Sequence, residues 1–164
     1  MRNKRLSIIP LCLFFGLLAS CAMTPDFDTT QVDQTLTPQS VIAEPEISHG
    51  KIALWGGTIL DIHNLENSTQ IEMLAYPLNT SHRPVLESAP MGRFIIQHKG
   101  YLEATNYAQG RLLTVLGSVS GSQSGKIGES SYTYPLINSQ QLHLWSLYDD
   151  QSNTSFHFGL GIRL

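Results

Sequence analysis

Cysteine is almost absent from the sequence, and charged side chains are few. Only two of the 164 residues are cysteines, at positions 12 and 21, so a disulfide framework beyond residue 21 is excluded. Ten Lys and Arg stand against 13 Asp and Glu, a formal net charge of −3 at pH 7. This balance argues against non-specific nucleic-acid binding, which needs clustered basic residues. The length leaves room for one domain and rules out a large multidomain enzyme.

The first twenty residues have the pattern of a targeting signal. They hold Arg2, Lys4 and Arg5 and no acidic residue, followed by an apolar run from Ile8 to Leu18 that is too short for a stable transmembrane helix. The run ends in Leu-Ala-Ser-Cys at 18–21, which resembles the bacterial lipobox. The motif predicts cleavage before Cys21 and attachment of S-diacylglycerol and N-acyl lipid to it. The alternatives are an ordinary secretory signal with an incidental cysteine, or a short membrane anchor.

Lipidation of Cys21 would fix the location of the mature protein. Two acyl chains already anchor a protein stably, because each buried CH₂ contributes about 0.8 kcal/mol. In enteric-type bacteria an Asp after the cysteine is the signal for retention in the inner membrane, and here Ala22 stands in that place. We therefore expect the lipoprotein processing and sorting machinery to deliver the protein to the outer membrane. No free thiol would remain for catalysis or metal binding.

Residues 21–48 are predicted to be an acidic tether. From Ala22 to Ser48 there are five acidic residues, no basic residue, three prolines and a single aromatic, Phe27. Such a composition buries too little apolar surface to offset the entropy of ordering the chain. A flexible coil of this length reaches roughly 30 Å. The alternative is an arm that packs on the following domain through Val41 and Ile42.

Residues 49–164 show short β-type runs separated by turn signals, which predicts an all-β domain. The expected strands are Lys51 to Ile62, Ile71 to Ala75, Arg93 to Gln97, Leu112 to Ser120, Tyr132 to Leu136, Gln141 to Leu147 and a terminal run from Phe156 to Leu164. Gly56-Gly57 suggests a bulge or a sharp coil in the first strand, and Gly121 to Gly128 reads as a hairpin loop. Gly100 to Gly110 is the one helix candidate of any weight.

Five or six core strands with a short helix after the third predict a small antiparallel β-barrel like the OB-fold. The rival architecture is a membrane-spanning barrel. It is disfavoured because the strands are short and lack aromatic girdles, and because a spanning protein needs no lipid anchor.

A series of short motifs resembles the Slp (starvation-inducible) family of outer-membrane lipoproteins. The motifs are Trp55-Gly56-Gly57, Ile71-Glu72 before Tyr76-Pro77-Leu78, Gly92-Arg93-Phe94, Gly100-Tyr101-Leu102 with Asn106-Tyr107, Thr114 to Gly117 with Gly121, Ile127-Gly128, Tyr132 to Pro135 and Leu144-Trp145. The sequence departs from the family at Glu103-Ala104, where the family tends to have Asp-Pro. The resemblance implies a lipoprotein on the periplasmic face of the outer membrane, associated with stationary phase or stress, and no established catalytic residues.

Known catalytic motifs are not matched. A P-loop ending at Gly125-Lys126 would need glycine where Ser120 stands and Ser or Thr in place of Ile127. Neither Gly-x₃-Gly segment in 117–125 centres on serine, so there is no nucleophile elbow. Asp61 and His63 could place two metal ligands on one strand face, but a solvent-exposed strand end is the more frequent reason for such a pair. We expect no enzyme activity, no metal and no cofactor besides the lipid.

The remaining candidates form a possible binding surface. The aromatic set is Trp55, Tyr101, Tyr107, Tyr132, Tyr134 and Trp145, which could bind an envelope glycan or protein, or could instead fill the barrel and its rim. Arg93 and Arg111 could bind an anion, or could pair with Glu72 or Glu103. These residues favour a periplasmic module with a binding or envelope-structural role. The alternatives are a carrier of a small hydrophobic ligand inside the barrel and an enzyme with an unrecognised site.

Overall fold

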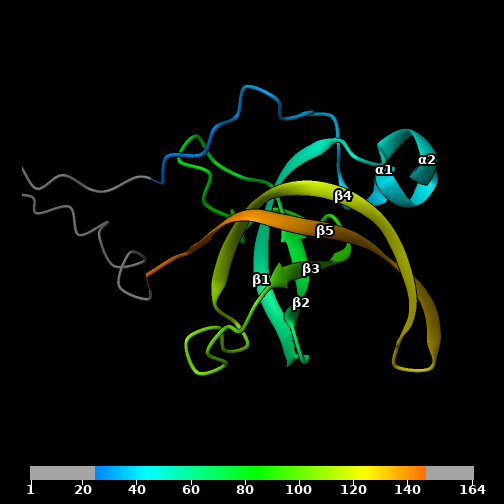
Figure 1. Cartoon of the computed structure of the whole chain (residues 1–164). Coiled ribbons are helices and arrows are strands. Elements are labelled where there is room, and N and C mark those ends of the chain that lie inside the picture. The colour runs from blue at the N-terminus through cyan, green and yellow to red at the C-terminus, as the bar shows by residue number, and fades with distance from the viewer. Residues whose placement is uncertain (1–24, 147–164) are drawn as a thin grey trace, which may run out of the picture.

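Five strands form the body of the computed structural model, which describes residues 25–146. They are β1 (Ile52–Asn64), β2 (Ser68–Tyr76), β3 (Arg93–Lys99), β4 (Leu112–Ile127) and β5 (Ser130–Leu144), and they close into a barrel in the order β1-β2-β3-β5-β4 (Figure 1). The predicted OB-like barrel is confirmed. One detail differs from a fully antiparallel sheet, because β3 and β5 pair in parallel at Ile95–Leu136 and Gln97–Asn138.

The second half of the barrel is one long hairpin rather than three short strands. β4 continues through the glycine- and serine-rich residues 121–127, which the sequence predicts as a loop, and turns at 128–129 into β5. The two expected strands, at 132–136 and 141–147, are joined in the single strand β5, which ends at Leu144. This hairpin extends away from the other strands (Figure 1). The low β-propensity of Gly and Ser led to the prediction of a loop. Pairing with β5 nevertheless holds these residues in a strand.

The predicted helix at Gly100–Gly110 is wrong. That segment is a chain of turns in which the carbonyl of Glu103 accepts from the N–H groups of Asn106 (3.0 Å) and Tyr107 (3.2 Å). The turn therefore forms with Glu103-Ala104 in place of Asp-Pro. The helices lie instead at α1 (Pro38–Ala43) and α2 (Pro45–Ser48). Thr37 caps α1 in a capping box with Ser40.

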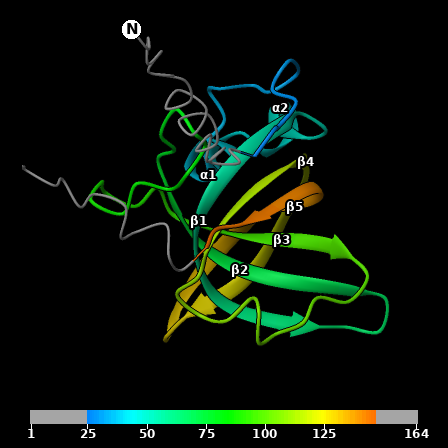
Figure 2. The same ribbon diagram turned by 90° about the vertical axis from the view of Figure 1, so that its left-hand side faces the viewer.

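Residues 25–48 are not a free tether; they form an arm that crosses one end of the barrel (Figure 2). Phe27 is 5% exposed and Val41 is fully buried, and α1 packs on β5 while α2 packs on β4. The alternative of a packed arm is thus the correct one for these residues. The composition is misleading because a few apolar anchors, not the average, decide whether a segment docks.

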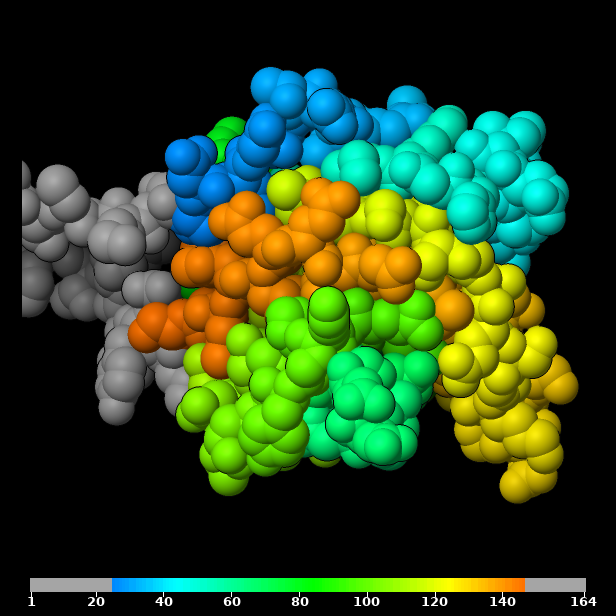
Figure 3. Space-filling model, in the orientation of Figure 1, coloured from blue at the N-terminus to red at the C-terminus, as the bar shows by residue number. Residues whose placement is uncertain are grey.

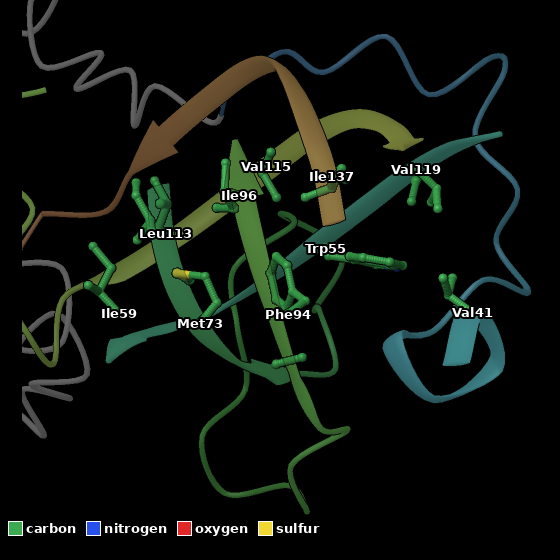
Figure 4. Packing of buried hydrophobic residues seen from close by; sticks show 13 residues of the cluster. Val41, Trp55, Ile59, Met73, Phe94, Ile96, Leu113, Val115, Val119 and Ile137 are labelled. Atoms are coloured by element: carbon green, nitrogen blue, oxygen red, sulfur yellow. The ribbon is translucent and has the colours of Figure 1, made fainter. Parts of the chain in front are cut away.

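The barrel interior is a packed core of 13 buried residues, ten of which are labelled in Figure 4. Trp55 contacts Phe94 edge-on, with ring centroids 5.1 Å apart, and Val41 reaches this end of the cluster from α1. Gly57 is needed for close approach, because a Cβ there would overlap the backbone carbonyl of Leu74. The register shift in β1 comes later, between Ile59 and Asp61, so the bulge suggested at Gly56-Gly57 is not there.

The expected terminal strand at Phe156–Leu164, together with Cys21 and Ala22, lies outside the described residues.

Candidate functional site

The outer face of β2 and β3 is mainly polar, with Ile95 and Leu74 as apolar residues on it. The alternate residues of β2 that point inward are fully buried, which turns Gln70 and Glu72 to the outside. Gln70 pairs across the strands with Gln97, so Gln97 and Lys99 of β3 continue the same face. In an OB-fold this face, together with the β1–β2 and β4–β5 loops, is where oligonucleotides and oligosaccharides bind.

Two hollows follow one another along this face, and we call them together the β2–β3 groove. The first has a volume of about 200 Å³ and is lined by His63, Gln70, Glu72, Ile95, Gln123, Gly125, Lys126 and Tyr134. The second has a volume of about 340 Å³ and is lined by Asn67, Ser68, Gln97, His98, Lys99, Asn138 and Ser139. The pair Gln70–Gln97 lies where the two meet. The groove is therefore elongated, and most of its lining side chains are polar, with amides and hydroxyls the most frequent groups.

The β4–β5 hairpin forms one wall of the groove. In Figure 3 it stands off from the green and teal strands and leaves a notch between them. Two tyrosines hold it in place: the Tyr132 hydroxyl accepts from the N–H of Arg93 at 2.9 Å, and the Tyr134 hydroxyl donates to Glu72 Oε1 at 3.3 Å. Their rings contact each other edge-on at 4.8 Å. The hairpin is thus positioned by side chains of β2 and β3 as well as by its own ladder.

The charges beside these tyrosines are largely neutralised. Arg93 Nη1 lies 2.7 Å from Glu72 Oε1, and this hydrogen bond raises the pKa of Arg93. Burial, followed by the nearby Glu72 carboxylate, raises the pKa of the Tyr134 hydroxyl, so it stays a donor at neutral pH. Lys126 and Lys99 are the other cations that line the groove. The groove therefore suits a neutral or mildly acidic ligand.

One contact in the second hollow resembles a nucleophile and its base. His98 Nδ1 lies 2.8 Å from Ser139 Oγ. A catalytic dyad of this kind is oriented by a third group, often a carboxylate, and the residues that line this hollow include none. The contact is thus a hydrogen bond between β3 and β5 at the lining of this hollow.

The pair Asp61 and His63 is formed, with His63 Nε2 3.1 Å from Asp61 Oδ2, and both side chains are more than half exposed. Within residues 25–146 no third acidic, histidine or cysteine side chain joins such a pair to make a metal site. The described part of the chain also holds no helix that is long and apolar enough to cross a membrane.

The structure does not gather the six predicted aromatic residues on one face. Trp55, Tyr134 and Trp145 are buried, at 2%, 4% and 7% exposure, and Tyr107 packs against the core. Tyr101 is 68% exposed but is not among the residues that line the groove. The set mostly fills the barrel and its rim, as the alternative interpretation has it. Only Tyr134, and Tyr132 beside it, border the groove.

Of the two predicted arginines, Arg93 pairs with Glu72 at the groove. Arg111 instead donates to two backbone carbonyls, those of Asn106 at 3.0 Å and Trp145 at 2.8 Å, and so ties the turns before β4 to the end of β5.

The groove residues that sequence reasoning missed are the amides and lysines: Gln70, Gln97, Gln123, Asn138, Lys99 and Lys126. The alternation of β2 could have placed Gln70 and Glu72 outside. Nothing in the sequence could show that the hairpin returns to cover them, because that depends on the parallel pairing of β3 with β5.

Comparison with known proteins identifies the family of the chain. Residues 18–159 match the outer membrane lipoprotein Slp family, and the match includes Cys21. The chain belongs to this family. The expected Slp resemblance is therefore confirmed, and with it the general kind of protein, an outer-membrane lipoprotein.

Three relatives match 60 to 84% of the chain. The outer membrane protein Slp of Escherichia coli is 28% identical over 140 residues, 84% of this chain and 74% of that protein. The uncharacterised lipoprotein YeaY of the same species is 28% identical over 138 residues, 82% of this chain and 69% of its own length. An uncharacterised protein of Haemophilus influenzae is 36% identical over 100 residues, and the match spans 60% of this chain and 54% of that protein.

Among solved structures, a small single-stranded DNA-binding protein from Streptomyces coelicolor is similar at a TM-score of 0.39 and 14% identity, over 61% of this chain and 97% of that one.

Proposed function

We propose that the protein is a non-enzymatic, lipid-anchored module that binds a glycan chain of the cell envelope in the β2–β3 groove. In this proposal Cys21 carries the lipid, Ala22 directs the protein to the outer membrane, and the barrel faces the periplasm. A role in stationary phase or stress is part of the same proposal and rests on the family resemblance alone.

The elongated shape of the groove is the main observation that supports glycan binding. Two hollows in series along one sheet face accommodate several units of an extended polymer, whereas a compact ligand would need a single deep cavity. The barrel interior is filled by the buried cluster, which disfavours the alternative of a hydrophobic ligand carried inside the barrel.

The lining chemistry selects the kind of polymer. The side chains of Gln70, Gln97 and Ser139 each carry a hydrogen-bond donor and an acceptor. They can therefore pair with the hydroxyl and acetamido groups of sugars, which also both donate and accept. Single-stranded nucleic acid is disfavoured, because it needs a basic groove with exposed stacking rings, and Tyr134 is 4% exposed.

Co-sedimentation of the purified lipoprotein with isolated peptidoglycan sacculi tests this proposal. The double variant Gln70→Ala/Gln97→Ala should weaken retention about tenfold, the effect of losing one or two hydrogen bonds to the ligand. Tyr101→Ala is the matched control, since it removes an exposed aromatic side chain outside the groove.

Two outcomes would contradict the proposal. Absence of retention by sacculi would show that the glycan class is wrong. Equal retention of the double variant and the wild-type protein would show that glycan does not bind in this groove.

A further inference from the structure

A third hollow, separate from the two of the β2–β3 groove, lies between the N-terminal arm and the barrel, and we call it the arm pocket. Its volume is about 360 Å³, within the range of small-molecule sites. It is lined by Thr29, Val32, Asp33, Gln34, Leu36, Thr37, Leu54, Trp55, Tyr76, Leu78, Asn79, His82 and Met91. No lining residue is shared with the groove.

The pocket is amphipathic. Apolar side chains from three separate segments contribute to it: Leu36 from the arm, Leu54 from β1 and Met91 from the loop before β3. Trp55 also lines it, and the indole is 2% exposed and anchored by a hydrogen bond to the Leu36 carbonyl at 2.9 Å. Such a lining suits a ligand with an apolar body and a small polar head.

His82 supplies a polar group that lacks a partner. Its Nδ1 is buried and has no hydrogen-bond partner in the described part of the chain. Its backbone has φ of 62°, the left-handed region in which His, like Asn and Asp, is enriched among residues other than Gly, and its carbonyl accepts from Thr114 Oγ1 at 2.8 Å. A buried ring nitrogen without a protein partner is a group that a ligand can satisfy.

The pocket offers no partner to an anionic head group. Asp33, its one acidic lining residue, is held ionised by hydrogen bonds from the Thr35 hydroxyl, the Lys51 ammonium and the Thr35 N–H, which lower its pKa to about 2, and the Lys51 ammonium 3.1 Å away neutralises it. No lysine or arginine lines the pocket, so the carboxylate of an anionic head would lose water without gaining a counter-charge. A hydroxyl group carries no charge, and it pairs with His82 Nδ1 in either tautomer because it both donates and accepts.

We propose that the arm pocket binds a neutral single-chain amphiphile, with its hydroxyl head at His82 Nδ1 and its chain along Leu36 and Trp55. An apolar cavity of about 150 Å³ holds one benzene ring, so this pocket has room for about a dozen carbon atoms. This ligand class is a medium-chain alcohol or acylglycerol. The inference is independent of glycan binding in the groove.

A brominated chain tests the proposal through Trp55, because bromine quenches tryptophan emission on contact. The full lipoprotein in phospholipid vesicles is titrated with 11-bromo-1-undecanol, and we expect saturable quenching of part of the emission of its two tryptophans. Unbrominated 1-undecanol should restore the emission by competition. The matched acid, 11-bromoundecanoic acid, should bind about fivefold more weakly at pH 7, because its carboxylate is partly desolvated in a pocket that no lysine or arginine lines.

Val32→Phe, which fills the pocket from the arm, should abolish the saturable quenching, whereas Gln70→Ala in the groove should leave it unchanged. Quenching that does not saturate, or that persists in Val32→Phe, would overturn the proposal. Equal or tighter binding of the acid would overturn the neutral head group, and loss of quenching in Gln70→Ala would place the ligand in the groove instead.

Discussion

The indole Nε1 of Trp55 donates a hydrogen bond of 2.9 Å to the carbonyl oxygen of Leu36, which lies 19 residues earlier in the chain. This bond joins the arm directly to the most buried end of β1, since Trp55 also packs edge-on against Phe94 in the core. The arm and the barrel are therefore expected to unfold as one cooperative unit.

Trp55→Phe should lower the free energy of unfolding by roughly 2 kcal/mol, because it removes this hydrogen bond and leaves a gap in the core. It should also make the chain near Leu36 sensitive to protease. Urea unfolding followed by circular dichroism and limited proteolysis with mass spectrometry measure the two effects. Trp145→Phe is the comparison, since its indole bonds to Thr114 and not to the arm. Equal protection near Leu36 in both variants would show that the Trp55 bond does not hold the arm.

A pair of aliphatic residues in the arm tests how much of its docking is hydrophobic. Val41 is fully buried against the core cluster, whereas Ile47 is 63% exposed. Val41→Ala should cost about 2 kcal/mol of stability and Ile47→Ala less than about 0.5 kcal/mol. Chemical denaturation of the two variants side by side gives both values. Similar small losses in the two would mean that the arm contributes little to folding.

These anchors show why sequence reasoning succeeded for the barrel and failed for the arm. Strand alternation, as at Leu113 and Val115, is a local signal and is repeated along each strand. Docking of the arm depends on isolated residues, Phe27 and Val41, whose partners are far away in the sequence. The groove was missed for the same reason, because Gln70 and Gln123 approach each other only after the β4–β5 hairpin returns over β2. Local sequence patterns do not indicate contacts between residues that are far apart in the chain.

The Asp33 carboxylate should make attachment of the arm sensitive to acid. Its pKa is lowered from 3.8 to about 2 by the Thr35 hydroxyl and by Lys51, whose Nζ lies 3.1 Å away. A depressed folded-state pKa contributes stability above pH 4, and that contribution is lost as the pH falls from about 4 to 2. Asp33→Asn should remove this part of the pH dependence, measured as the denaturation midpoint at pH 7 and at pH 3. A wild-type midpoint that falls no more than the variant's would contradict the assignment.

Gly117 and Gly125 of β4 should differ in how well they tolerate a side chain. A Cβ at Gly117 would overlap the backbone carbonyl of Asn138, whereas at Gly125 it would meet only the ring of Tyr134, at 2.8 Å from Cε2. A side chain can rotate away and a paired strand cannot, so Gly117→Ala should cost about 3 kcal/mol or more and Gly125→Ala about 1 kcal/mol. Thermal unfolding of the two variants measures the difference. Comparable melting temperatures would mean that β4 and β5 can separate at Gly117 without penalty.

Lipid attachment and sorting give the sharpest test of the proposed location. Cys21→Ser removes the only acceptor for the diacylglycerol, so the variant should keep its signal, migrate as a larger species and take up no labelled palmitate. Ala22→Asp should be lipidated normally but shift toward the inner membrane on a sucrose gradient. The two changes separate anchoring, which follows from buried acyl chains, from sorting, which follows from the residue after the cysteine. Processing and fractionation of Cys21→Ser like the wild-type protein would refute the anchor, whereas an unchanged distribution of Ala22→Asp would refute only the sorting signal.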